Sequence, residues 1–266
     1  MELKFENNSF GRRLKSMLAV DFRRMFTMPL FYIISGICLA APVLILVMTT
    51  LMDGSVSVDP QTGVETIVQG FDSVWQIIGT VGGSSSGGMD MMSMCNINML
   101  YFGLAALVGL FVTEDFKSGY AKNLFTVRAR KSDYVISKTL VCFAGGALMI
   151  AAFFLGSVLG GAISGLSFGL GSLTVANVIL CLLSKMLLVA VFVPIYLAVS
   201  VAAKQKTWMA LVGSFAVGML LFMMVPMITP LAATMLNVAL CLVGGMVFSA
   251  AMGLVSNLVL KKCDIL

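Results

Sequence analysis

Long apolar segments separated by shorter polar ones run through almost the whole chain. About 20 consecutive apolar residues are needed to cross the hydrocarbon core of a bilayer. Six segments reach that length, at residues 28–51, 95–112, 135–162, 175–201, 207–228 and 234–260. They are too continuous for barrel strands, and a backbone in lipid must satisfy its own hydrogen bonds. The pattern therefore predicts an all-α integral membrane protein with six transmembrane helices.

The basic residues gather on one side of these predicted spans. They occur before the first span, between the second and third, between the fourth and fifth, and at the end of the sixth. The connection 52–94 carries five acidic residues and no Lys or Arg. Cytoplasmic connections are enriched in Lys and Arg, so both termini are predicted to be cytoplasmic and 52–94 is an outer loop. We expect a multi-pass protein of the cell (plasma) membrane.

Residues 1–27 precede the first span and predict a cytoplasmic amphipathic helix. One face carries Phe10, Leu14, Met17, Leu18, Phe22, Met25 and Phe26, and the other Arg12, Arg13, Lys15, Arg23 and Arg24. Such a helix lies in the headgroup layer of an anionic leaflet. Asp21 projects near the apolar face, and we favour a local pair with Arg24 or a neighbouring Arg over a contact with a partner. Residues 28–266 then form one transmembrane domain.

Composition excludes several function classes. Apolar residues make up 59% of the chain and charged residues 11%, against roughly 25% charged in soluble domains. The chain has no histidine, no G-x-x-x-x-G-K-[ST] phosphate loop and no C-x-x-C pair. These absences argue against histidine-based catalysis, ATP binding by this chain and a metal site. We expect no enzyme activity, no cofactor bound by the chain and no nucleic-acid partner.

The outer loop 52–94 contains an apolar part and a glycine–serine part. An apolar stripe at 71–78 predicts a short interfacial helix anchored by Trp75. The run 82–88 contains only Gly and Ser and predicts a flexible tether into the second span, with an outer gate as the alternative.

Glycine and proline mark specific points of the later spans. Gly156 and Gly160 have the GxxxG spacing that lets helices approach closely in lipid. Pro194 in the fourth span has no N–H to give the carbonyl of Ala190, which predicts a kink.

Lys185 is an ionisable residue inside the predicted fourth span. A charge at mid-membrane costs about 2.5–3.5 kcal/mol on insertion scales, so it should face protein or water. Two interpretations remain open. Lys185 lines a cargo path that favours acidic groups, or it snorkels to the outer headgroups.

A polar island at 111–140 interrupts the apolar pattern and holds six of the seventeen basic residues. Within it, 113–134 is a candidate cytoplasmic coupling segment. Gly119 permits a tight turn, and residues 120–127 can form two turns of helix. Phe116, Tyr120, Leu124 and Phe125 would give this short helix an apolar stripe, which we expect to dock onto something.

At these residues the chain resembles ABC-2-type permease subunits of ATP-binding cassette transporters. The resemblance rests on Phe111, Glu114 or Asp115, Gly119, Lys122, the basic cluster and Lys138. It extends to the architecture of an amphipathic N-terminal helix, six spans and a long first outer loop. The usual proline before the basic residue is absent at 127–130, and the last outer connection is short. Small Gram-positive exporters of antimicrobial or cytolytic peptides are the most similar members.

The resemblance implies a permease subunit of an ATP-driven exporter. ATP and Mg²⁺ would bind a separate cytoplasmic ATP-binding cassette subunit, and a second permease copy would complete the pore, with a homodimer favoured over a heterodimer. The implied coupling residues are Asp115, Phe116, Lys117, Gly119, Tyr120, Lys122 and Phe125, with Arg23 and Arg24 as second candidates. The cargo would be an amphipathic peptide or another hydrophobic, antibiotic-like molecule.

Two other classes of function remain open. A secondary carrier would work without an ATPase, but it would need buried acidic or polar clusters and inverted repeats, which the sequence does not show. A membrane sensor or immunity protein would bind a peptide at the acidic outer loop.

Overall fold

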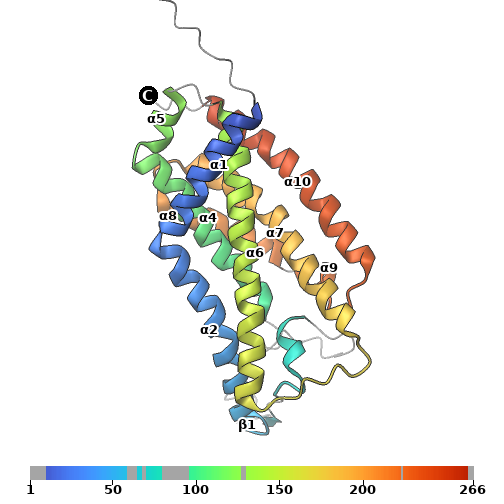
Figure 1. Cartoon of the computed structure of the whole chain (residues 1–266). Coiled ribbons are helices and arrows are strands. Elements are labelled where there is room, and N and C mark those ends of the chain that lie inside the picture. Colours follow the sequence, from blue (N-terminus) through green and yellow to red (C-terminus); the bar gives the residue numbers. More distant parts are fainter. Residues whose placement is uncertain are drawn as a thin grey trace, which may run out of the picture.

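The computed structural model describes residues 10–58, 65–67, 70–79, 96–126, 130–222 and 224–262 (Figure 1). The helices are α1 (Phe10–Thr27), α2 (Pro29–Met52), α4 (Leu100–Lys117), α5 (Tyr120–Thr126), α6 (Lys131–Ser164), α7 (Val175–Ala203), α8 (Thr207–Phe222), α9 (Val225–Ile228) and α10 (Met235–Lys262). Two 3₁₀ helices, η1 (Val74–Ile77) and η2 (Ile97–Met99), and an antiparallel pair of strands, β1 (Val56–Val58) and β2 (Glu65–Ile67), complete the described elements.

The all-α membrane class is confirmed. Within the described ranges, five helical segments are long and apolar enough to cross a membrane: α2, η2 with α4, α6, α7 and α10. The predicted span 207–228 differs, because α8 ends at Phe222 and a turn separates it from α9. Sixteen residues of α-helix are about 24 Å long, less than the roughly 30 Å hydrocarbon core. The predicted polar segment is also shorter than expected, since α4 continues to Lys117 and α6 starts at Lys131.

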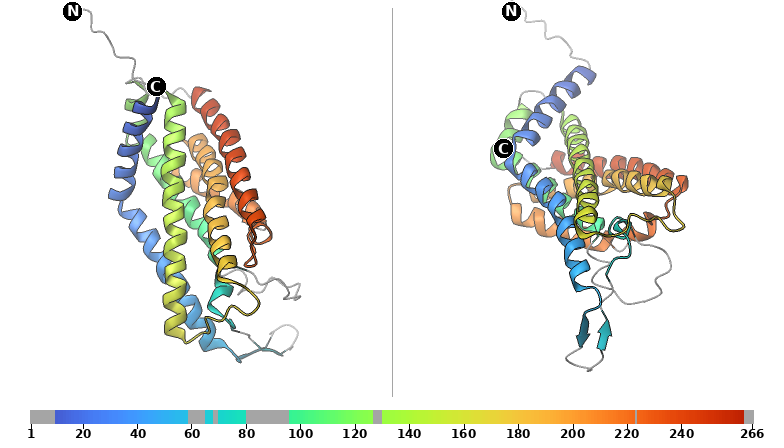
Figure 2. Two further views of the ribbon diagram at one scale, coloured as in Figure 1. Left: turned by 45° about the vertical axis from the view of Figure 1, so that its right-hand side comes forward. Right: turned by 60° about the horizontal axis from the view of Figure 1, so that its bottom comes forward.

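The bundle has two distinct ends. At one, here named the α5 end, the starts of α1 and α6 and the end of α10 lie together (Figure 2). Arg13 of α1 pairs with Asp133 of α6 at 3.2 Å, and Lys131 Nζ donates to the carbonyl of Leu260 at 2.7 Å. At the other, here named the η1 end, lie η1 and the β1–β2 hairpin (Figure 1). The α9–α10 connection approaches η1, since a Cβ at Gly79 would lie 3.0 Å from the backbone N of Leu231.

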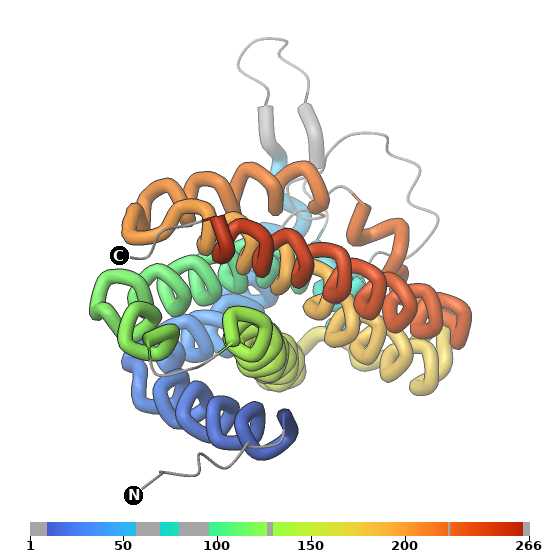
Figure 3. The backbone as a smooth tube through the Cα atoms, turned by 90° about the horizontal axis from the view of Figure 1, so that it is seen from above, coloured from blue at the N-terminus to red at the C-terminus, as the bar shows by residue number. Residues whose placement is uncertain are grey.

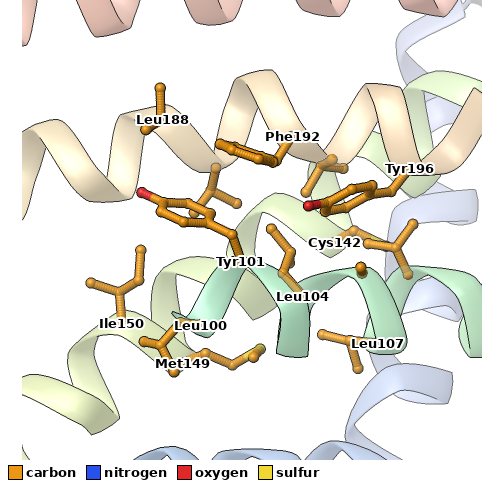
Figure 4. Packing of buried hydrophobic residues seen from close by; sticks show 14 of the residues in the cluster. Leu100, Tyr101, Leu104, Leu107, Cys142, Met149, Ile150, Leu188, Phe192 and Tyr196 are labelled. Carbon is orange, nitrogen blue, oxygen red and sulfur yellow. The ribbon is translucent and has the colours of Figure 1, made fainter. Parts of the chain in front are cut away.

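Helices α4 and α7 form the centre of the bundle, and α6 packs against both. Tyr101 of α4 stacks on Phe192 of α7 with ring centroids 4.4 Å apart, above Met149 and Ile150 of α6 (Figure 4). Helices α2, α8 and α10 are peripheral and expose large apolar side chains. When the bundle is viewed along α6, helices α1 and α8 lie on opposite sides of that helix (Figure 3). The exposed apolar surface suits lipid as the surrounding solvent.

The predicted close approach at Gly156 and Gly160 is confirmed, and the partner helix is α2. A Cβ at Gly156 would lie 2.2 Å from the carbonyl oxygen of Leu39, and one at Gly160 would lie 2.8 Å from Cα of Val43. Only glycine allows the two backbones to pack at this distance.

The carbonyl that Pro194 leaves without its helical N–H has a partner on another helix. Ser249 Oγ of α10 donates to the carbonyl oxygen of Ala190 at 3.0 Å. A turn before Ser249, Gly245 allows close contact, because a Cβ there would lie 3.0 Å from Cβ of Ala190. A hydroxyl from a neighbouring helix is one of the ways in which membrane helices tolerate proline. This contact joins α7 to α10, its most extensive packing partner.

The 3₁₀ helix η1 packs one side against the bundle, and its predicted place at the membrane interface stays a prediction. Val74 and Ile77 are fully buried, and a Cβ at Gly161 of α6 would lie 2.2 Å from a methyl group of Val74. Trp75 donates its indole N–H to the carbonyl of Phe168 at 3.0 Å, which anchors η1 to the α6–α7 connection. The glycine–serine run 82–88 lies outside the described residues.

Candidate functional site

Four charged side chains from three helices meet near the α5 end. Lys138 Nζ of α6 lies 2.8 Å from Asp21 Oδ1 of α1 and 2.7 Å from Asp115 Oδ2 of α4. Arg24 Nη1 of α1 lies 2.6 Å from Asp115 Oδ1. The side chains of Asp21, Asp115 and Lys138 have no exposed surface. We name these four residues the charge network.

The charge network is balanced. Two carboxylates face one ammonium and one guanidinium, so its formal charge is zero. Two hydroxyls add hydrogen bonds, from Tyr134 to Asp115 at 2.9 Å and from Ser137 to Asp21 at 2.6 Å. Buried ion pairs offset the loss of hydration only when close pairing and further hydrogen bonds compensate the charges. Removing one partner would leave an uncompensated buried charge.

The placement of Asp21 follows from helical spacing. Met17, Asp21 and Met25 recur every four residues and form the buried face of α1, which packs along α6. The favoured interpretation, a local pair of Asp21 with an arginine, is wrong, because Asp21 pairs with Lys138 and accepts a hydrogen bond from Ser137, both on α6. The predicted division of α1 into an apolar and a basic face also changes. Arg24 turns inward to Asp115, while apolar residues such as Phe26 are exposed.

Aromatic rings connect the charge network to α5. The Arg24 guanidinium lies 4.0 Å from the ring centroid of Tyr120, the first residue of α5. Lys138 Nζ lies 3.9 Å from the ring centroid of Phe111 in α4. Burial opposes the charge of Arg24, but Asp115 outweighs it and raises the pKa of Arg24, while burial raises the pKa of Tyr120. Arg24 therefore stays cationic and Tyr120 neutral, so this cation–π contact persists over the physiological pH range.

Helix α5 is confirmed over Tyr120–Thr126. Gly119 has φ +72°, a left-handed conformation that glycine adopts without strain, and it reverses the chain after α4. The chain itself covers part of the predicted apolar stripe. The rings of Phe116 and Phe125 pack edge-on against Tyr134 of α6, with centroids 6.5 and 5.5 Å away. Tyr120, Leu124 and Phe125 are only partly buried, so docking of this stripe onto a partner stays a prediction.

The predicted coupling residues fall into three groups by exposure. Lys117, Lys122 and Arg23 are exposed; Gly119, Tyr120, Phe125 and Arg24 are partly buried; Asp115 and Phe116 are buried. A fully buried carboxylate cannot contact another protein directly in this conformation. Asp115 thus belongs to the internal network, and the exposed side chains form the accessible surface around α5.

Sequence reasoning did not select Asp21, Tyr134 or Lys138 as site residues. Lys138 enters the sequence analysis only through the family resemblance, and Asp21 only as a residue near an apolar face. The available signal was the same in both cases. An ionisable residue among apolar neighbours at helical spacing needs a buried counter-charge.

Lys185 lies in a second buried polar cluster, toward the η1 end of α7. Its Nζ donates to Asn98 Oδ1 of η2 at 2.7 Å and to Thr229 Oγ1, just after α9, at 2.9 Å. The residue is 1% exposed, so the interpretation that it snorkels to the headgroups is wrong. Its place in a cargo path stays a prediction.

No group of three or more Asp, Glu or Cys residues within the described ranges could hold a metal ion. A family model described as "ABC-2 family transporter protein" matches residues 23–220, from the second half of α1 into α8. No curated protein and no solved structure matches the chain.

Proposed function

The chain belongs to the ABC-2 family of transporter proteins, and from that premise we propose that it is the permease of an ATP-driven exporter. Membership makes it a multi-pass membrane protein and the membrane subunit of an ABC transporter, and it implies an ATP-binding cassette partner. The family match over most of the chain is the observation that carries the proposal. Export, the cargo, the mode of coupling and the oligomeric state belong to the proposal itself.

In the proposed mechanism, a cytoplasmic ATPase binds at α5. The exposed residues Lys117 and Lys122 form the contact surface, with Arg23 of α1 beside it. Both termini and the α5 end face the cytoplasm, in agreement with the concentration of basic residues there. ATP and Mg²⁺ bind the partner, since this chain has no phosphate loop.

The charge network transmits the movement of α5 to the spans. Tyr120 contacts Arg24, Arg24 pairs with Asp115 of α4, and Asp115 shares Lys138 of α6 with Asp21 of α1. Buried pairs of this kind resist separation, so α1, α4 and α6 move as one body at this end. ATP-driven closure of two ATPases would then rock this body between inward- and outward-open arrangements.

We propose a homodimer that exports an amphipathic peptide or a similar hydrophobic, antibiotic-like molecule. Support comes from the many exposed apolar side chains of α2, α8 and α10 and from the twenty-one methionines, which adapt to varied partners. Lipid contact and core packing account for most of these residues. The proposed class of cargo is taken from the resemblance to small Gram-positive exporters of antimicrobial or cytolytic peptides.

Co-purification with a partner tests the proposal. The chain would be co-expressed with an ATP-binding cassette protein encoded beside it in the source genome, and the complex followed by size exclusion in mild detergent. The double variant Lys117→Glu/Lys122→Glu reverses charge on the α5 surface without touching the core. The control Lys262→Glu reverses one charge at an exposed lysine that ends α10.

We expect wild type and the Lys262→Glu control to co-elute with the ATPase and the double variant to elute alone. Equal binding by all three would remove α5 as the docking surface. A wild-type chain that binds no ATPase would contradict the exporter and favour a secondary carrier or a peptide-binding sensor.

A further inference from the structure

Lys185 joins three separate parts of the chain through one ammonium group. It lies on α7, its Asn98 acceptor belongs to η2 ahead of α4, and its Thr229 acceptor follows α9. Asn98 and Thr229 are as buried as Lys185 itself. Both hydrogen bonds are short and involve a charged donor, so each is stronger than a neutral one.

Neighbouring bonds brace the same three parts. The hydroxyl of Tyr101 in α4 donates to the backbone carbonyl of Lys185 at 3.0 Å. Asn177 near the start of α7 donates to the carbonyl of Ala233 in the connection to α10 at 3.1 Å. Thr229 donates its hydroxyl to the carbonyl of Val225, which leaves its oxygen lone pairs for Lys185. The bonds of Lys185 therefore close the space between α4, α7 and the α9–α10 connection.

The two buried lysines of the described chain are compensated differently. Lys138 pairs with two carboxylates, whereas Lys185 donates to an amide oxygen and a hydroxyl. Neutral oxygens hold an ammonium less strongly than carboxylates, and water can replace them. We call the contacts of each buried lysine with its acceptors a joint. The joint at Lys138 is suited to staying closed, and the joint at Lys185 is suited to opening.

We propose that Lys185 is the latch that closes the transport pathway at the η1 end. Separation of η2 and the α9–α10 connection from α7 breaks both of its hydrogen bonds and opens the pathway on the side opposite α5. The latch rests on the proposed transport function, since it names the residue that gates that pathway. Its opening is nevertheless measurable without the ATPase.

Cys181 is a native reporter of this opening. It lies one helical turn before Lys185, is fully buried, and places Sγ 3.8 Å from the carbonyl oxygen of Thr229. A thiol at this position reacts with a maleimide only when the joint opens. Cys142 of α6, also fully buried, serves as the control thiol, since its charged neighbour is Lys138 rather than Lys185.

The experiment uses the full chain in nanodiscs, in two backgrounds that keep either Cys181 or Cys142 as the single cysteine. A water-soluble maleimide is added, and the labelling rate is read by mass spectrometry. Lys185→Met removes the ammonium at similar length, and Thr229→Val removes one acceptor at similar volume. Lys206→Met, at an exposed lysine in the turn between α7 and α8, controls for loss of charge.

Lys185→Met removes both hydrogen bonds of the ammonium and Thr229→Val removes one of them, so we expect Cys181 to be labelled roughly tenfold faster or more in each variant than in wild type. The acceleration in the double variant should be smaller than the product of the two single accelerations, because both substitutions remove the Lys185–Thr229 contact. Labelling of Cys142 and the Lys206→Met control should stay at the wild-type rate.

Unchanged labelling of Cys181 in both latch variants would overturn the proposal. Equal acceleration at Cys142 would do the same, because it would show general loosening of the fold. If Lys185→Met does not fold, Thr229→Val alone decides the question. If the latch variants label Cys181 faster but the chain binds no ATPase, the exporter proposal is contradicted and the latch proposal stands. If the chain binds the ATPase but the latch variants label Cys181 at the wild-type rate, only the latch proposal is contradicted.

Discussion

Replacement of Lys138 by methionine tests the charge network most directly. Met is close to Lys in length, so Lys138→Met removes the ammonium with little change in packing. Two buried carboxylates then face only the guanidinium of Arg24. The site therefore carries one net negative charge, and neither carboxylate is exposed to solvent. Asp115 keeps its pair with Arg24, whereas Asp21 loses its pair with Lys138 and keeps the hydrogen bond from Ser137.

The expected cost of Lys138→Met is about 3–5 kcal/mol of unfolding free energy, the usual result of removing one partner of a buried ion pair. Asp21→Asn should cost a similar amount, because it leaves two cations with Asp115. The double variant Asp21→Asn/Lys138→Met restores balance, with only the Arg24–Asp115 pair remaining. It should therefore be more stable than the sum of the single effects, by roughly 1.5–3 kcal/mol.

Reversible unfolding by SDS in mixed micelles, followed by tryptophan fluorescence, would measure all four corners of this cycle. Lys122→Met makes the same substitution at an exposed lysine of α5 and should change stability by less than about 0.5 kcal/mol. Additive single effects would refute the network as a coupled unit. A Lys138→Met variant as stable as its control would refute the burial argument itself.

Two further substitutions probe helix packing, both by the same unfolding assay. Ser249→Ala removes the donor to the carbonyl of Ala190 and should lower the free energy of unfolding by roughly 1 kcal/mol. Ser256→Ala should cause no measurable loss, because that buried hydroxyl has no hydrogen-bond partner among the described residues. Equal losses at the two serines would contradict the role of the α10 hydroxyl. Gly156→Ala should separate α6 from α2 and cost roughly 1–3 kcal/mol or more, whereas Gly36→Ala, with no atom within 4 Å of the added Cβ, should be neutral or slightly stabilising. A tolerated Gly156→Ala would show that α2 can move away without loss.

The architecture was predictable because it depends on one-dimensional patterns. Apolar segment length placed the long helices, and the glycine spacing identified Gly156 and Gly160 as points of close approach. The turn at Gly119 and the helix after it also followed from local residue preferences. The end of α8 at Phe222 was missed, since an apolar run continues through the turn that precedes α9.

The site was less predictable because its contacts join residues distant in the chain. Asp21 and Lys138 are more than a hundred residues apart, and no local pattern specifies which carboxylate a buried lysine meets. The same limit applies to Ser249 and Ala190, and to Lys185 and Thr229. The family resemblance implied that Asp115 is a coupling residue, whereas the helical phase of α4 buries it. A pattern of charges predicts the side of the membrane more readily than the partner of any one residue.

The two buried lysines give the bundle a mechanical asymmetry. At the α5 end, Lys138 holds Asp21 and Asp115 by charge, so α1, α4 and α6 resist separation. At the η1 end, Lys185 holds its neighbours by neutral acceptors, which water can replace at a lower cost. A force applied at α5 would therefore be carried through the first joint and released at the second. The substitution Thr229→Asp replaces a neutral acceptor of Lys185 by a carboxylate. It should hold the η1 end closed and slow Cys181 labelling below the wild-type rate. Faster labelling in that variant would contradict the asymmetry.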